Sequence, residues 1–274
     1  MRRIWVTGML GLCAATACGC GGDYILTVPD QIAPVGGEAV TVVRLQRNDF
    51  FVLAPAIEEA AMRFRAADGP LRGAYTDKLG YAGAAVPVPR EPGRYAMEVA
   101  HLDIHGDEVA RKADLYVWEP SRPVVAVDMD CLPGLWIGSS KSASDALRGL
   151  AVGANLLYLT RRSARRHRTA HEALTKAGYP AGPVLTWQRE RWHIVRDGRF
   201  RLPRIVVESR LVSQLPELRK SFPGLTMGVC DSALAARAFS AADMEVMVVG
   251  GAPVDRAAKV RRRNSWADLA AKGL

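Results

Sequence analysis

The pattern of hydrophobic and polar positions changes near Glu119-Pro120-Ser121. Upstream of this boundary, short apolar segments are separated by turn residues such as Gly36-Gly37 and Asp68-Gly69-Pro70. This pattern predicts short strands joined by turns, as in a β-sandwich. The expected strands are Tyr24–Val28, Ala39–Gln46, Ala60–Ala66, Ala84–Val88, Arg94–Leu102 and Glu108–Trp118.

One turn in this region has a recognisable form. The segment Glu91-Pro92-Gly93-Arg94-Tyr95, followed by the alternating Met97, Val99 and Leu102, resembles the turn and late strand of immunoglobulin-like domains. The resemblance implies that Tyr95 packs back on the turn. It also implies an immunoglobulin-like sandwich over residues 23–120, serving as a spacer or as a module for a partner that the sequence does not identify.

Downstream of the boundary, strand-like and helix-like segments alternate. The apolar run that ends at Asp128 has no polar alternation, so it predicts a strand covered on both faces. The pattern predicts helices at Ser142–Val152, Ser163–Ala177, Leu211–Ser221 and Ser232–Ala241. It predicts further strands at Asn155–Thr160, Leu225–Cys230 and Glu245–Val249, the expected final strand, and a hairpin turn at Asp197-Gly198 within the polar segment Trp192–Leu202. Such alternation is typical of a Rossmann-like parallel α/β sheet flanked by helices, which we expect over residues 121–274.

Polar side chains follow several of the predicted strands at their carboxyl ends. They are Asp128, Asp130, Thr160 and Asp231. In a parallel sheet these ends meet at one crevice, so we expect the four residues to converge. Clustered carboxylates repel one another, and a hard cation such as Mg²⁺ relieves that repulsion. Solvated aspartates at ordinary strand ends are the alternative reading of each residue taken alone.

The second region resembles the haloacid dehalogenase-like hydrolase superfamily, and within it the lipin-type phosphatidate phosphatase group. Val124–Asp130 resembles the first motif, Tyr158-Leu159-Thr160-Arg161 the second and Gly228-Val229-Cys230-Asp231 the fourth. The segment Tyr179–Leu185 is similar to the one that follows the second-motif helix in this group.

The resemblance implies a role for each matching residue. Asp128 would be the nucleophile that takes the phosphoryl group, and Asp130 the general acid and base. Thr160 would bind phosphoryl oxygens, and Arg210 would stand where the third motif has a lysine, with Lys220 as a substitute. Asp128, the backbone carbonyl of Asp130, and Asp231 would hold Mg²⁺.

Several positions depart from the family pattern. Cys131 and Leu132 replace the glycine and threonine that usually continue the first motif, while Cys230 and Ala235 replace a glycine and an aspartate of the fourth. Because the superfamily places these two strands side by side, the resemblance implies that Cys131 and Cys230 lie near each other. They are expected either within disulfide range, with Cα atoms about 4.4–6.8 Å apart, or packed as buried free thiols.

Two functions therefore remain open. The first is a Mg²⁺-dependent phosphatase that acts through an aspartyl-phosphate on a phospholipid or another bulky phosphate ester. It would be capless, because the spacing from Asp130 to Thr160 leaves little room for an inserted cap domain. The second is an inactive pseudophosphatase that serves as a lipid-anchored binding or scaffolding protein.

The two regions carry opposite charge within a chain of net charge +9. Residues 23–120 contain 10 Lys and Arg against 15 Asp and Glu, a net −5, whereas residues 121–274 contain 25 against 13, a net +12. The basic clusters favour an anionic phosphate ester or phospholipid surface, although a solvated basic face explains them equally well. Nucleic acid is disfavoured because aromatic residues are not interleaved with the clusters.

The chain begins with features of an export signal. Met1-Arg2-Arg3 precedes an apolar segment, Ile4 to Leu12, and Ala15-Thr16-Ala17-Cys18 resembles a bacterial lipobox. Residues 1–22 are therefore expected to form a signal peptide with lipobox, with lipid on Cys18 or, as a second candidate, Cys20. A plain secretory signal is the alternative. The lipid anchor would place the protein in the cell envelope, on the periplasmic side of the outer membrane.

Overall fold

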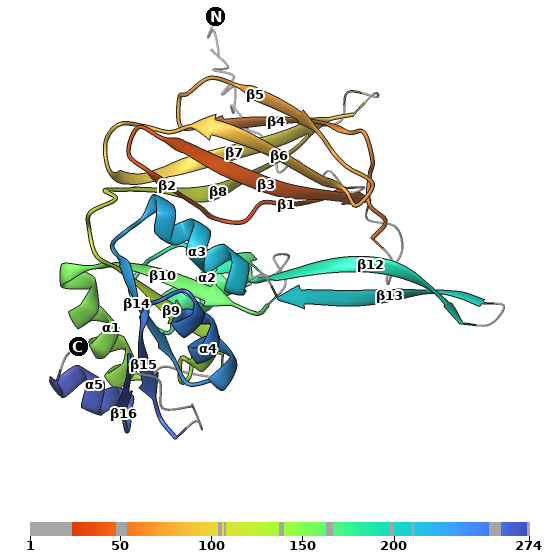
Figure 1. Cartoon of the computed structure of the whole chain (residues 1–274). Coiled ribbons are helices and arrows are strands. Elements are labelled where there is room, and N and C mark those ends of the chain that lie inside the picture. Colours follow the sequence, from red (N-terminus) through yellow and green to blue (C-terminus); the bar gives the residue numbers. More distant parts are fainter. Residues whose placement is uncertain are drawn as a thin grey trace, which may run out of the picture.

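The computed structural model of the 274-residue chain describes residues 24–47, 54–103, 106, 108–136, 140–162, 167–197, 200–209, 211–251 and 259–272. The proposed lipidation sites Cys18 and Cys20 and the candidate Arg210 lie outside these residues. Within the described residues the strands form four sheets, of three, five, six and two strands. Figure 1 shows the three- and five-stranded sheets stacked above the six-stranded sheet, with the two-stranded hairpin extending to one side.

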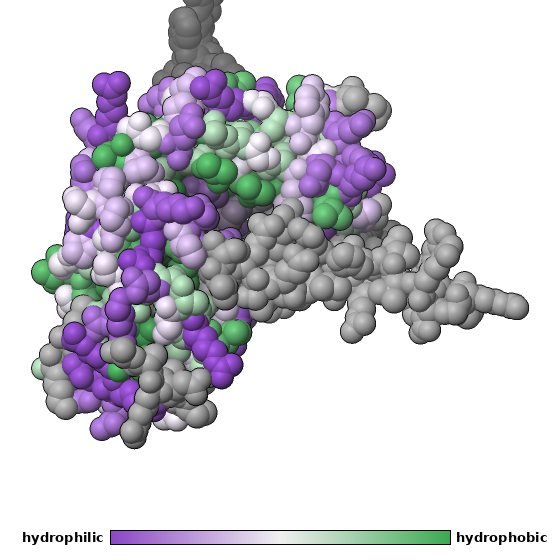
Figure 2. All heavy atoms as spheres, viewed as in Figure 1, coloured by the Kyte–Doolittle hydropathy of each residue, from purple (hydrophilic) through white to green (hydrophobic). Residues whose placement is uncertain are grey.

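The N-terminal region contains two of these sheets. The three-stranded sheet has the order β1-β3-β6, and the five-stranded sheet has the order β2-β8-β7-β4-β5. Their strands are β1 (Tyr24–Thr27), β2 (Gln31–Pro34), β3 (Glu38–Arg47), β4 (Ala61–Ala66), β5 (Arg72–Tyr75), β6 (Tyr81–Pro87), β7 (Gly93–Leu102) and β8 (Glu108–Trp118). The five-stranded sheet is mixed, because β2 pairs in parallel with β8 and its other pairs are antiparallel. Figure 2 shows apolar side chains over β3, where Val40 and Val42 are exposed.

The six-stranded sheet is parallel throughout and has the order β11-β10-β9-β14-β15-β16. Its strands are β9 (Val124–Asp128), β10 (Asn155–Thr160), β11 (Val184–Thr186), β14 (Leu225–Cys230), β15 (Glu245–Val249) and β16 (Val260–Arg263). Every residue of β9 is buried, as its uninterrupted apolar run predicts. Glu245–Val249 is not the final strand, because β16 follows it and closes that edge of the sheet.

Helices cover both faces of this sheet. The helices are α1 (Lys141–Gly153), α2 (His167–Lys176), α3 (Leu211–Ser221), α4 (Ala233–Ala241) and α5 (Trp266–Lys272). One core cluster joins Val125 and Val127 to residues of α1, α2 and α5, and another joins Val124 and Ala126 to residues of α3 and α4. None of the helices in the described part of the chain has the length and apolar character needed to cross a membrane.

The hairpin β12 (Gln188–Asp197) and β13 (Phe200–Ser209) forms a sheet of its own. Its ten antiparallel pairs run from Gln188 opposite Ser209 to Asp197 opposite Phe200. It projects from the body of the molecule, away from the helices that flank the parallel sheet (Figure 1).

The structure corrects the predicted fold class, an immunoglobulin-like sandwich followed by a separate Rossmann-like sheet. The chain does not divide into two such units, since the five-stranded sheet and the parallel sheet share a hydrophobic core. Tyr116 and Trp118 of β8 belong to the same buried cluster as Val124 and Phe222. The rings of Trp118 and Phe222 meet edge to face with centroids 5.8 Å apart. Apolar burial across this junction joins the five-stranded sheet to the parallel sheet.

Candidate active site

The site is built on Asp128, the last residue of β9. Its side chain is almost fully buried, and both carboxylate oxygens accept hydrogen bonds. Oδ1 accepts from the Asp130 backbone N–H at 3.2 Å, which caps the short 3-10 helix Met129–Cys131. Oδ2 accepts from Ser232 Oγ at 3.3 Å. Burial and the two hydrogen bonds hold this carboxylate in one orientation.

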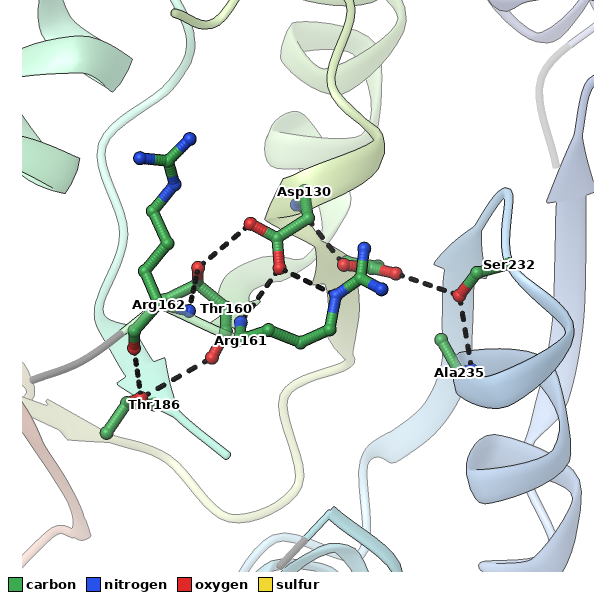
Figure 3. Close-up of polar contacts among 8 residues, drawn as sticks. Asp130, Thr160, Arg161, Arg162, Thr186, Ser232 and Ala235 are labelled. Carbon is green, nitrogen blue, oxygen red and sulfur yellow. Dashed lines mark hydrogen bonds and ion pairs between the residues drawn. The ribbon is translucent and has the colours of Figure 1, made fainter. Parts of the chain in front are cut away.

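Asp130 lies beside Asp128 and is held by the end of β10. Its Oδ1 accepts a hydrogen bond from Thr160 Oγ1 at 3.1 Å. Its Oδ2 accepts from Arg161 twice, from the backbone N–H at 2.8 Å and from Nε at 3.1 Å. Figure 3 shows that Thr160 and Arg161 contact different oxygens of the Asp130 carboxylate. Thr160 and Arg161 together determine the direction in which this side chain points.

Two further hydroxyl contacts organise the segment that follows β10. The Arg162 backbone N–H donates to Thr160 Oγ1 at 3.1 Å. Thr186 Oγ1, at the end of the neighbouring β11, donates to the Arg162 carbonyl at 2.6 Å. The Arg162 guanidinium lies over the Trp136 ring, 3.5 Å from its centroid. These contacts turn the chain sharply after Thr160, so that Arg161 faces Asp130 while the Arg162 side chain points away from it (Figure 3).

The end of β14 supplies the third part of the site. β14 pairs in parallel with β9, which brings Asp231 and Ser232 next to Asp128. Ser232 is the N-cap of α4 and accepts from the Ala235 N–H at 3.3 Å, while it donates to Asp128. Asp231 is exposed. Ala235, where the resemblance implies a second aspartate, is buried and supplies only its backbone N–H.

The negative charges of the site act on one another. Burial and the charge of Asp130 raise the pKa of Asp128 from its usual 3.8 to about 6, although the charge of Arg161 opposes the rise. Partial desolvation by neighbouring atoms also raises the pKa of Asp231, although the residue as a whole is exposed, and Arg161 again opposes the rise. Raised carboxylate pKa values in a cluster mark a place where extra positive charge is favoured.

The donor chemistry fits a hard divalent cation. Asp128 and Asp231 offer carboxylate oxygens, and Asp130 offers its backbone carbonyl, which are the ligand types that Mg²⁺ prefers. The three carboxylates, however, do not bring three side-chain oxygens within 4.8 Å of one another. Among the described residues, Asp30, Asp114 and His171 do bring three possible ligand atoms this close, two carboxylate oxygens and one ring nitrogen.

Asp30, Asp114 and His171 lie at the junction of the sheets, away from Asp128. The buried Asp30 Oδ2 contacts His171 Nε2 at 2.5 Å and accepts from the Val184 N–H at 2.9 Å. Asp114 pairs with Arg94 at 2.7 Å. This cluster is already supplied with hydrogen-bond donors and with a cation, so it links β8, α2 and β11 as a structural element.

The structure brings together most of the residues that the sequence singles out. Asp128, Asp130 and Thr160 are in contact directly or through one residue, and Asp231 interacts electrostatically with Asp128 and Asp130. Cys131 and Cys230 are both buried and free. They lie close enough that the charge of Cys230 contributes to the raised pKa of the Cys131 thiol.

Two residues of the site have roles that sequence reasoning missed. Ser232 bonds the proposed nucleophile, and Arg161 pairs with the proposed acid and base. Arg161 stood out only as the last residue of the segment that resembles the second motif. The signal for both was their position, since each follows directly on a strand-end residue that was already a candidate.

No protein-family model matches the chain, and neither does any curated protein. Solved structures similar to the chain include a carbohydrate acetylesterase from Xanthomonas citri, with TM-score 0.33, 12% identity and coverage of 83% of this chain and 51% of that one. A 2,6-sialyltransferase from Photobacterium sp. aligns with TM-score 0.24, 11% identity and coverage of 80% and 41%. The chain thus spans about half the length of these proteins or less. At these TM-scores the likeness carries no inference about fold or activity.

Proposed function

We propose that the protein is a Mg²⁺-dependent phosphatase in which Asp128 is the nucleophile. The observation that carries the proposal is the pairing of a buried, doubly hydrogen-bonded Asp128 with Asp130, which Thr160 and Arg161 orient. A carboxylate with a pKa of about 6 is mostly ionised at neutral pH, as nucleophilic attack requires.

In the proposed reaction a bond forms between an Asp128 oxygen and phosphorus as the ester P–O bond breaks. Asp130 donates a proton to the departing ester oxygen. It then accepts a proton from the water that attacks the aspartyl-phosphate, which releases phosphate and restores Asp128. Thr160 orients Asp130 by donating its one hydroxyl proton to Asp130 Oδ1, and it would donate to a phosphoryl oxygen only when that hydrogen bond breaks.

Asp128 and Asp231, with the carbonyl of Asp130, are the groups that would hold Mg²⁺. When bound, the ion would neutralise charge on the transferred phosphoryl group. The raised pKa of Asp128, caused by burial and by the charge of Asp130, supports a cation at this place.

The proposed substrate is a phospholipid or another bulky phosphate ester. Arg161 and Arg168 are exposed, and positive charge near the site favours an anionic surface. We propose in addition that a lipid on Cys18 holds the protein at the envelope, where such a surface is available; this residue lies outside the described part of the chain.

Phosphate release from a panel of phosphate esters, including phosphatidic acid vesicles, tests the function. Wild type with Mg²⁺ should release phosphate, and Asp128→Asn should lose at least about 10³-fold in rate, since a general-base or nucleophile deletion removes several kcal/mol of transition-state stabilisation. Asp145→Asn is the matched control, because Asp145 is exposed on α1 and its change should leave the rate unaltered. No release from any ester, or equal release by Asp128→Asn, would contradict the proposal.

A specific observation favours a second candidate, an inactive binding or scaffolding protein. Arg161 already forms an ion pair with the proposed acid and base, while Cys131, Cys230 and Ala235 replace residues that the resemblance implies. A protein that binds a phosphate ester without releasing phosphate, with equal affinity in the presence and absence of Mg²⁺, would establish this alternative.

A further inference from the structure

Arg161 is the cation that the structure places within the carboxylate cluster. Its Nε and its backbone N–H both donate to Asp130 Oδ2. In Figure 3 its guanidinium lies between the carboxylate of Asp130 and Ser232, the side chain that bonds Asp128. Three carboxylates interact with it, since Asp128, Asp130 and Asp231 all raise the pKa of Arg161.

The surroundings of Arg161 hold it at this place. Its backbone is tied to Asp130 by a 2.8 Å hydrogen bond. Its guanidinium carbon lies 5.9 Å from the centroid of the Trp187 ring, and Trp187 is almost fully buried. A guanidinium near an aromatic ring gains a further attraction. The side chain is nevertheless 41% exposed, so its departure from Asp130 would not require the core to open.

A divalent cation held by Asp128, Asp231 and the Asp130 carbonyl would therefore neutralise two of the three carboxylates that interact with Arg161. We infer that Arg161 is a built-in counter-ion that competes with Mg²⁺ for the negative charge of Asp128 and Asp231, so that Mg²⁺ binds weakly while Arg161 stays paired with the Asp130 carboxylate. The inference rests on the proposed function, since it concerns the metal site of that reaction. It adds a form of regulation: the site stays metal-poor until an anionic group, such as a phosphate ester, draws the guanidinium away.

Arg162 provides a matched control. It is the next residue in the chain and carries the same charge, but its side chain stacks on Trp136 and points away from Asp130 (Figure 3). Removing either arginine changes the net charge by the same amount. A difference between the two variants therefore reports the position of the charge rather than its loss.

The experiment is isothermal titration of Mg²⁺ into the full chain and its variants at pH 7.5 without substrate. Arg161→Ala and Arg161→Gln should bind Mg²⁺ at least about tenfold more tightly than wild type, which corresponds to about 1.4 kcal/mol. Arg162→Ala should bind like wild type. Circular dichroism establishes whether each variant is folded. If Arg161→Ala does not fold, Arg161→Gln, which keeps most of the side-chain length, is the variant that tests the inference.

Equal or weaker binding by a folded Arg161 variant overturns the inference, as does equal tightening by Arg162→Ala or an absence of Mg²⁺ binding in all of the proteins. The outcome is separable from that of the proposed function. Tighter metal binding by Arg161→Ala without phosphate release would leave the counter-ion role in place and remove the phosphatase. Phosphate release by wild type, with the same metal affinity in Arg161→Ala as in wild type, would support the phosphatase and remove the counter-ion role.

Discussion

At the scale of single residues, Asp128 combines good hydrogen bonding with an unfavourable charge. Its two oxygens accept from Asp130 and Ser232, yet burial and the charge of Asp130 raise its pKa to about 6. The folded pKa therefore lies above the value of about 3.9 in an unfolded chain. The stability that this group contributes is fully present below about pH 4 and is lost as the pH rises through 6.

Asp128→Asn should consequently make the metal-free protein more stable at high pH. The asparagine oxygen can accept from the Asp130 N–H, and its amide can donate to Ser232 Oγ, so the shape and bonding survive. At pH 8 with EDTA we expect a gain of roughly 3 kcal/mol over wild type, from a shift of about two pKa units, which shrinks toward zero near pH 4. Urea unfolding across this pH range measures it. A difference in unfolding free energy between Asp128→Asn and wild type that does not change with pH would contradict this expectation.

At the scale of elements, Gly228 allows helix α4 to pack closely on strand β14. A Cβ at this position would lie 2.3 Å from two ring carbons of Phe239, a fully buried residue of α4. The missing side chain thus determines how near the helix approaches the sheet.

Gly228→Ala should lower the free energy of unfolding by about 1–3 kcal/mol, because overpacking a filled core forces side chains or backbone to shift. Gly149→Ala is the control. Gly149 lies on the exposed face of α1 with nothing within 4 Å of a built Cβ, so alanine there should stabilise by about 0.5–1 kcal/mol. Chemical denaturation of both variants measures the changes, and effects of the same sign would count against this account of the packing.

The contact between His171 of α2 and Asp30 ties a helix of the parallel sheet to the segment between β1 and β2. Burial lowers the pKa of His171, but the hydrogen bond and charge of Asp30 raise it more, with Asp114 adding to and Arg94 opposing the rise. The net pKa is above 6.5. The contribution of this pair is therefore fully present below about pH 6.5 and is lost as the pH rises through the raised folded pKa.

His171→Gln should remove this pH dependence. The melting temperature of wild type should fall from pH 6 to pH 9 by more than that of the variant, since only wild type loses a proton from this pair. Differential scanning calorimetry in matched buffers measures the two profiles. Parallel profiles would show that the His171–Asp30 contact does not titrate in this range.

At the scale of the whole molecule, the N-terminal sheets and the parallel sheet are joined through Trp118 and Phe222. The rings meet at 72° with centroids 5.8 Å apart, and both are buried. Because each ring comes from a different region, their contact couples the stability of the two.

A double-mutant cycle of Trp118→Ala and Phe222→Ala should therefore show a coupling energy of about 0.5–1.5 kcal/mol, the usual range for an aromatic pair. The control cycle pairs Phe222→Ala with Tyr75→Ala. Tyr75 is 74% exposed on β5, and its effect should add to that of Phe222 within about 0.5 kcal/mol. Equal couplings in the two cycles would show that the junction does not act through this pair.

Local features were predictable to different degrees. The strands that end at Asp128, Thr160 and Cys230 lie where the sequence predicts them, because long apolar runs need burial on both faces. Tyr95 packs back on its turn, with its hydroxyl donating to the Glu91 carbonyl at 3.0 Å. Strands β2 and β5 were missed, since each has four residues and a weak pattern. The Tyr95 turn has the predicted form, but the predicted fold class was wrong.

The sequence by itself determined the strand ends, and with them the approach of Asp128, Asp130 and Thr160, because parallel strands deliver their carboxyl ends to one edge of a sheet. Only the tertiary structure decided which cation pairs with these carboxylates and which distant residues pack or bond with one another. The pair of Arg161 with Asp130 depends on the turn after β10, and the joining of Trp118 to Phe222 and of Asp30 to His171 brings together residues more than 100 positions apart. Periodicity reports the burial of a position but not its partner, so contacts at such separations carry no signal in a single sequence.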